Sequence, residues 1–362
     1  MNVTYVICIM VTGILLSSKS GCSQEKNYSE LDKFEYVANP VPSYFPGKSW
    51  NRTDPLKMGW SADKLEKAHQ YFDSLNADAF MLISGGYVIA SWGETQKKIN
   101  VRSIRKSLLN GLFGVYIDSI NINLRLSDLG IDDSKKLSEK EKEAKIKDLL
   151  TSTSGIYLPA NYTTSEADEK KPARGSKKAG EHWYYNNWDF NALGTLYSKI
   201  TSQDIFKSFE QKIAIPLQME DFSMDDTEMI IDNGSVHPAY VFKLTARDAA
   251  RFGLLYLRKG SWNKQSLISS EWIEESTRSH FTVTKYFDYG YLWWILKDRS
   301  GTRLGYMARG NGGQFIFVNP ELDMVAVLLA DPGSILNKWL GKRIELKESL
   351  TLLGKVLDAK SN

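Results

Sequence analysis

Short strand-like runs lie near the two ends of this chain, and their placement constrains the fold more than any other feature. Residues 79–84 and 87–92 are two β-prone runs around the pair Gly85-Gly86, which is the pattern of a tight hairpin. Further β-prone runs separated by turn residues cover 289–296, 303–308, 314–318 and 324–329. Because the middle of the chain has no strand periodicity, we expect one antiparallel sheet built from both ends, with a helical region at about 103–285 inserted between them.

Two amphipathic helices are expected beside this sheet. Ser61 is a good N-cap, and Leu65, Ala68 and Phe72 follow it at helical spacing. A charged amphipathic segment over about residues 342–357 closes the chain. The predicted fold class is therefore α+β, with an antiparallel sheet flanked by N- and C-terminal helices and an inserted helical region.

The first 22 residues have the features of a bacterial export signal. The apolar run at 3–16 is too short to span a bilayer comfortably and fits the hydrophobic part of such a signal. Small residues precede Cys22 as in a lipoprotein cleavage site, although Lys19 and the uncharged Met1-Asn2 depart from that pattern. We expect a lipid on Cys22 that attaches the chain to a membrane; a cleaved signal with Cys22 as a bystander is the alternative.

These features predict the organisation of the chain. A signal peptide covers residues 1–21, a polar and then Pro-rich tether covers 22–58, and a single folded domain covers 59–362. The expected location is the periplasm or the cell envelope.

Composition excludes several classes of protein. The formal charge of +3 is small and basic residues alternate with acidic ones, so a nucleic-acid partner is disfavoured. The two cysteines, Cys8 and Cys22, both lie in the expected signal, and the four histidines have no zinc-binding spacing. We therefore predict no disulfide scaffold, no metal and no cofactor.

The first motif with chemical meaning is S-x-x-K at Ser103 and Lys106. The two residues lie one turn apart on a helix whose following turns are apolar on nearly all sides, which indicates burial. Burial lowers the pKa of a lysine, so that the neutral amine can accept a proton. Ser103, with helix N-terminal N–H groups nearby to polarise an oxyanion, would be an activated nucleophile.

S-x-x-K is weakly specific by itself, because the chain contains it four times. The other three copies lie in the tether, on the first helix and in a Gly-flanked loop, so context favours Ser103. The alternative is that Ser103 is an ordinary N-cap and Lys106 a surface lysine.

A second motif, Y-x-N, occurs twice in overlap, at Tyr184-x-Asn186 and Tyr185-x-Asn187, and nowhere else in the chain. A phenol near the serine can relay a proton, and the amide can hydrogen-bond both the lysine and a substrate carbonyl. The alternative is an aromatic cluster that packs a helix start.

A Gly-rich approach to a strand forms the third motif. Gly312 and Gly313 would let a substrate backbone come close to the strand edge, and the N–H of Gln314 could be a second oxyanion donor. The alternative is a plain hairpin turn.

In this order the three motifs resemble the serine β-lactamase and penicillin-binding protein superfamily, specifically its class C-like branch. The resemblance runs from about residue 60 to 335 and includes 149–155, which looks like that branch's "LLTxTSG" segment. The aromatic pattern around Tyr185 looks most like the esterase and 6-aminohexanoate-oligomer hydrolase relatives. The resemblance implies a β-lactamase/transpeptidase-like fold.

The resemblance also implies roles for individual residues. Ser103 matches the acylating serine, Lys106 its basic partner and Tyr185 the general acid/base. Asn187 matches the supporting amide, and Gln314 the strand residue whose N–H joins that of Ser103 in the oxyanion hole.

One position departs from the family pattern. Asn311 stands where the family usually has Lys or His, and an amide cannot attract a substrate carboxylate as a cation does. Neutral substrates therefore fit better than β-lactams or D-Ala-D-Ala peptides, unless Arg105, Arg309 or the charged loop Ser165–Lys178 compensates. That loop is read either as a lid or, more simply, as a solvated surface loop.

These observations predict an exported serine hydrolase that cleaves a small-molecule ester or amide through an acyl-enzyme. One alternative is a D-Ala-D-Ala carboxypeptidase or β-lactamase. Another is a non-catalytic cell-envelope lipoprotein that keeps the same fold as a binding module.

Overall fold

The computed structural model describes residues 34–164, 169–232, 234–331 and 343–360. Its strands are β1 Glu35–Tyr36, β2 Asn51–Arg52, β3 Ala79–Ser84, β4 Tyr87–Gly93, β5 Ile99–Asn100, β6 Thr227–Ile230, β7 Ala239–Leu244, β8 Ser261–Trp262, β9 Gln265–Ser266, β10 Phe281–Thr284, β11 Phe287–Tyr289, β12 Trp294–Lys297, β13 Arg303–Arg309, β14 Phe315–Asn319 and β15 Met324–Leu329. The α-helices are α1 Ala62–Asp73, α2 Ile104–Val115, α3 Glu139–Lys142, α4 Ile146–Leu150, α6 Asn187–Thr201, α7 Ile205–Phe209, α8 Ala246–Leu257, α9 Ser270–Thr277 and α11 Leu346–Leu357. Short 3-10 turns cover Pro55–Met58, Ile117–Ser119 and Met224–Asp226, and a π-helical turn covers Glu210–Ala214.

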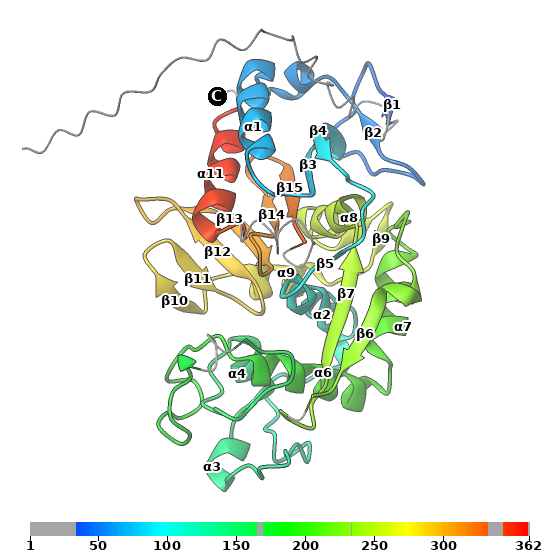
Figure 1. Cartoon of the computed structure of the whole chain (residues 1–362). Coiled ribbons are helices and arrows are strands. Elements are labelled where there is room, and N and C mark those ends of the chain that lie inside the picture. Colours follow the sequence, from blue (N-terminus) through cyan, green and yellow to red (C-terminus); the bar gives the residue numbers. More distant parts are fainter. Residues whose placement is uncertain (1–33, 165–168, 233, 332–342, 361–362) are drawn as a thin grey trace, which may run out of the picture.

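The large sheet is assembled from both ends of the described chain. Its order is β1-β2-β4-β3-β15-β14-β13-β12-β11-β10, and neighbours pair antiparallel except β1-β2 and β2-β4, which are parallel. The N-terminal strand β3 pairs directly with the C-terminal strand β15 (Figure 1). The predicted α+β fold class is confirmed.

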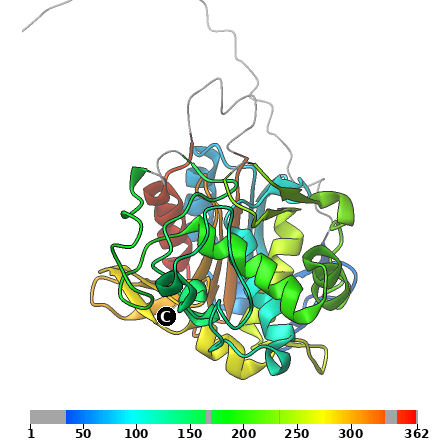
Figure 2. The same ribbon diagram turned by 90° about the horizontal axis from the view of Figure 1, so that it is seen from below.

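Helices cover both faces of this sheet because its central strands are apolar on both sides. Along β3, Phe80 and Leu82 point into the core under α1 and α11, whereas Met81 and Ile83 point into the larger core with α2 and α8. Figure 2 shows the sheet between α11 and the helices of the inserted region. The helices predicted at the two ends are confirmed as α1 and α11, which pack side by side.

The hairpin predicted at Gly85-Gly86 is confirmed as the β3–β4 turn. Both glycines have positive φ (60° and 95°). A Cβ on Gly86 would lie 1.9 Å from the carbonyl oxygen of Tyr44, so both backbone conformation and space require glycine there.

The inserted region is less purely helical than predicted. β5, β7 and β6 form a separate three-stranded sheet, in which Ile99 pairs with Leu244. The run at 289–296 is also not one strand: β11 ends at Tyr289, the chain turns through Leu292 (φ 61°), and β12 returns antiparallel.

Residues 34–58, assigned to the tether by sequence, pack on the domain. β1 and β2 extend the large sheet, and Trp50 is fully buried, with its Nε1 donating to the carbonyl oxygen of Arg247 at 3.2 Å. The signal peptide at 1–21 and Cys22 lie outside the described residues, as do positions 165–168 of the charged loop.

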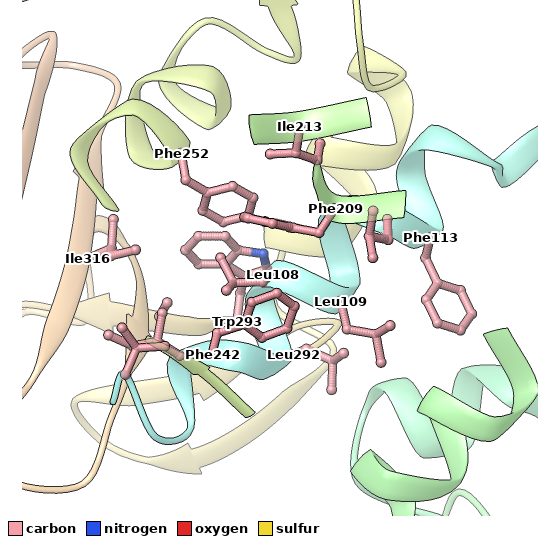
Figure 3. Packing of buried hydrophobic residues seen from close by; sticks show 14 of the residues in the cluster. Leu108, Leu109, Phe113, Phe209, Ile213, Phe242, Phe252, Leu292, Trp293 and Ile316 are labelled. Carbon is pink, nitrogen blue, oxygen red and sulfur yellow. The ribbon is translucent and has the colours of Figure 1, made fainter. Parts of the chain in front are cut away.

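Helix α2 runs through the middle of the larger core and carries the first motif. Leu108, Leu109 and Phe113 are fully buried, and Figure 3 shows them among side chains from other elements, including Phe252 and Trp293. Each such side chain contributes roughly 1.5–3 kcal/mol of hydrophobic free energy on burial. A helix anchored in this way holds its first turn in a fixed position.

Candidate active site

Ser103 is the N-cap residue of α2, but its side chain makes no capping hydrogen bond. The preceding residue, Arg102, has a left-handed backbone (φ 51°), and its N–H donates to Oδ1 of Asn100 at 2.9 Å. This strained turn leads the chain from β5 into α2 and leaves Ser103 half-buried beside a pocket.

Lys106 lies below Ser103 and is almost completely buried, with 2% of its surface exposed. Its Nζ is 3.0 Å from Oγ of Ser103, 2.9 Å from the hydroxyl oxygen of Tyr185 and 3.0 Å from Oδ1 of Asn187. It forms no salt bridge with any described carboxylate. The structure thus brings together four residues that the sequence analysis selected separately.

The electrostatic environment favours the uncharged forms of Lys106 and Tyr185. Burial and then the positive charge of Arg105 lower the pKa of Lys106 well below its usual value of 10.5. Burial raises the pKa of Tyr185 above 10.0, against the opposite effects of the Ser103 hydroxyl, Arg105 and Arg309. The pair therefore consists of an amine able to accept a proton and a phenol able to donate one.

The second motif is positioned by the segment at 149–155. Ser152, which has φ 60°, donates its hydroxyl to the carbonyl oxygen of Tyr184 at 2.6 Å and accepts the N–H of Asn186 at 3.0 Å. Asn186 caps α6, so only Tyr185 and Asn187 of the overlapping triplets reach Lys106.

A buried carboxyl group supports the same segment from the other side. Asp189 has no exposed surface, and its Oδ1 accepts from Ser154 Oγ at 2.5 Å and from Asn186 Nδ2 at 2.8 Å. Burial raises the pKa of Asp189 well above its usual 3.8, so its neutral form is favoured. It orients the Y-x-N turn and does not contact Lys106.

The third motif docks against the turn that precedes Ser103. Nε2 of Gln314 donates to the carbonyl oxygen of Asn100 at 3.1 Å, and a Cβ on Gly310 would lie 2.7 Å from the carbonyl oxygen of Val101. Among the described residues, the backbone N–H groups of Ser103 and Gln314 have no hydrogen-bond acceptor. They are therefore available as a pair of oxyanion donors.

Gly313 is explained differently from the prediction. It has φ 79°, and a Cβ there would lie 2.4 Å from Cγ2 of Ile344, so the space is used by the chain itself and not by a substrate. Gly312, Gly313 and Gln314 line an adjoining cavity beside the start of α11, whereas Asn311 also lines the pocket at Ser103.

The pocket at Ser103 has a volume of about 500 Å³ and a positively charged lining. Besides Ser103, Tyr185, Asn187 and Asn311, its described lining includes five cationic side chains: Arg102, Arg105, Lys170, Arg309 and Arg343. None of the described lining residues is an aspartate or a glutamate. The sequence analysis missed Arg102, which directly precedes the nucleophile, and Arg343, which approaches the pocket only in three dimensions.

Two other features were searched for in the described part of the chain. It contains no group of three or more His, Cys, Asp or Glu side chains arranged to hold a metal ion. None of its helices combines the length and apolar character needed to cross a membrane.

Solved structures with this fold include several hydrolase-like proteins. A provisionally named β-lactamase from Bacteroides dorei superposes with a TM-score of 0.62 at 17% identity, covering 82% of this chain and 98% of that one. A provisionally named 6-aminohexanoate-dimer hydrolase from Bacillus anthracis gives a TM-score of 0.60 at 15% identity, covering 91% and 87%. An octameric penicillin-binding protein homologue from Pyrococcus abyssi gives 0.56 at 19%, covering 78% and 76%. At these identities the similarity establishes the fold.

Sequence comparison identifies the family. No curated protein matches the chain. A family model described as Beta-lactamase matches residues 129–332, a span that contains the Y-x-N and Gly-Gly motifs and begins after Lys106. Because this match covers more than half of the sequence and agrees with the fold, the chain belongs to the β-lactamase family.

Proposed function

We propose that this protein is an exported serine hydrolase that cleaves an ester or amide bond through a covalent acyl-serine intermediate. One observation carries the proposal: the buried Nζ of Lys106 lies within 3.0 Å of both the Ser103 and the Tyr185 hydroxyl oxygens. A buried amine beside two hydroxyls is the arrangement needed to activate one of them as a nucleophile and to use the other as a proton donor.

Acylation would use these groups in a balanced sequence. The neutral amine of Lys106 takes the hydroxyl proton of Ser103 as Oγ bonds to the substrate carbonyl carbon. The N–H groups of Ser103 and Gln314 hold the resulting oxyanion. When the tetrahedral intermediate collapses, Tyr185 donates its proton to the leaving group and recovers a proton from Lys106. Water then hydrolyses the acyl-serine by the reverse proton path.

The free hydroxyl of Ser103 supports a catalytic site over a binding module. In a merely structural N-cap, the Ser103 side chain would bond the N–H groups of the first helical turn, and Lys106 would extend to solvent. Here the hydroxyl caps nothing and Lys106 is buried without a described counter-ion. Burying an unpaired amine costs folding free energy, which is a common feature of functional sites.

Intact-mass analysis after incubation with an activated ester, a fluorophosphonate or a penicillin tests the proposal. We expect one covalent adduct in the wild type with at least the ester or the fluorophosphonate, and none in Ser103→Ala. Ser261→Ala, which alters the exposed serine of another S-x-x-K copy, is the matched control and should label like the wild type. Undiminished labelling of Ser103→Ala would contradict the assignment, and labelling by penicillin as fast as by the ester would favour the β-lactamase or carboxypeptidase alternative.

Export and lipidation of Cys22 are part of the same proposal and rest on the first 22 residues. Expression of the full chain in a Gram-negative bacterium, followed by fractionation and mass analysis of the mature N-terminus, tests both. We expect a membrane-associated protein that begins at a diacylglyceryl-modified Cys22, and a cleaved but unlipidated product from neither fraction. Uncleaved protein in the cytoplasm would contradict export, and cleavage elsewhere would contradict lipidation.

A further inference from the structure

The pocket at Ser103 contains more positive charge than the proposed hydrolysis requires. Its described lining includes five cationic side chains and no carboxylate. Like charges gathered around one cavity repel each other, and an anion placed among them is attracted by all of them. The charge of the lining therefore carries information about the substrate, provided that the proposed hydrolase function holds.

Arg309 is the cation with the least internal support. Its guanidinium carbon lies 4.5 Å from the ring centre of Trp294 and 5.0 Å from that of Phe287. It makes no hydrogen bond and no salt bridge with any described residue. The two rings hold the group in place but leave its N–H donors without acceptors.

Two further arginines are only partly satisfied. Arg105 is 1% exposed; its Nη2 donates to Asn191 Oδ1 at 2.9 Å, but its buried Nη1 has no partner in the described structure. Arg102 donates Nη1 to the hydroxyl of Tyr162 at 2.6 Å, while its Nε is buried without a partner. Arg102 also occupies a left-handed position that favours glycine. Neutral partners leave the charge of each guanidinium uncompensated.

We propose that this pocket selects substrates that carry an anionic group, a carboxylate or a phosphate, and that Arg309 is the residue that binds it. A guanidinium fixed on an aromatic surface with free donors matches the two oxygens of such a group. Arg309 lies two residues before Asn311 and lines the same pocket. The positive charge that Asn311 does not supply is therefore present in the site, which reverses the preference for neutral substrates expected from sequence.

Matched pairs of esters test this inference. In one pair the acyl group differs, para-nitrophenyl valerate against mono-para-nitrophenyl glutarate. In the other the leaving group differs, phenyl acetate against meta-carboxyphenyl acetate. We expect the wild type to have the higher kcat/KM for the anionic member of at least one pair, and that pair identifies the side of the scissile bond that Arg309 faces.

Variants assign the preference to Arg309. Arg309→Met keeps the apolar stem over Trp294 and should lower the anionic-to-neutral ratio of kcat/KM by about 10- to 100-fold, the range of a charge-assisted hydrogen bond. Arg309→Lys keeps the charge and should retain part of the ratio. Arg303→Met removes an exposed charge from the same strand, outside the pocket, and should leave the ratio unchanged.

The outcomes separate this inference from other roles of Arg309. If Arg309→Met slows both members of each pair equally, Arg309 acts through Tyr185 and the inference is wrong. Equal rates for both members in the wild type overturn it as well, while the hydrolase function stands.

A binding measurement covers the case in which no ester is hydrolysed with dependence on Ser103. The hydrolase function then fails, but glutarate or inorganic phosphate should still raise the melting temperature of the wild type more than that of Arg309→Met. The more effective of the two anions identifies the group preferred. No difference between the two proteins with either anion would overturn the inference independently of catalysis.

Discussion

The hydroxyl oxygen of Ser103 lies 3.0 Å from Nζ of Lys106, and this contact replaces the capping bond that a serine at a helix N-terminus normally makes. The first turn of α2 is therefore stabilised from within the core, by its buried apolar side chains, and the Ser103 side chain is left free for chemistry. Stability and reactivity are consequently separable at this position.

Ser103→Ala should leave the free energy of unfolding within about 0.5 kcal/mol of the wild type, because no cap is lost. Ser269→Ala is the matched comparison. Ser269 caps α9 and accepts the N–H of Trp272 at 3.2 Å, so its loss should cost about 1 kcal/mol. Urea unfolding of both variants measures the difference. A cost for Ser103→Ala as large as that for Ser269→Ala would show that Ser103 is structural.

Lys106→Arg should slow acylation by at least about 100-fold, the lower end of the contribution expected from a general base. Arginine keeps the positive charge but does not lose its proton in a protein, so it cannot accept one from Ser103. The adduct formation rate with an activated ester measures the effect. Lys64→Arg, in the S-x-x-K copy on α1, is the control and should react normally. Near-normal acylation of Lys106→Arg would remove Lys106 from the catalytic role.

Local patterns account for the parts of the fold that were predicted correctly. The β3–β4 hairpin depends on alternating side chains and two glycines within 15 residues, all visible in sequence. The sheet β5-β7-β6 was missed because its pairing is not local: Ile99 is joined to Leu244. β7 also lacks alternation, since five of its six residues are buried.

The reacting side chains were predictable because each lies in a short motif with its own spacing. Their electrostatic surroundings were not, because Arg102, Arg309 and Arg343 come from three distant segments and meet only at the pocket. Sequence showed the absence of a cation at Asn311 but could not show which other cations replace it.

The pH dependence of acylation should report the protonation of Lys106. The positive charge of Arg105 helps to lower the pKa of Lys106, so the neutral amine forms, and the rate levels off, at a pH below 10.5. In Arg105→Met that charge is absent, the protonated amine is less disfavoured, and the pKa of Lys106 rises. The rising limb of the rate should therefore move to higher pH.

Arg105→Lys, which keeps a charge at this position, should leave the limb closer to that of the wild type. The pre-steady-state acylation rate between pH 5 and 10 measures all three proteins. A limb at the same pH in Arg105→Met and the wild type would mean that another group controls the rate.

The last prediction separates the two constraints on Gly313. Gly313→Ala meets both a left-handed backbone (φ 79°) and a Cβ contact of 2.4 Å with Ile344, whereas Gly301→Ala meets only the backbone constraint (φ 88°), with nothing within 4 Å. Gly301→Ala should therefore destabilise by about 1–2 kcal/mol, and Gly313→Ala by more, because Ile344 must move. The N–H of the adjacent Gln314 would shift with the turn, so Gly313→Ala should also lower kcat, by up to about 100-fold if an oxyanion donor is lost. Gly301→Ala, in the β12–β13 turn, should keep the wild-type kcat. Urea unfolding and ester turnover measure the two effects. If the two variants lose equal stability and Gly313→Ala keeps full activity, Gly313 does not position the oxyanion donor.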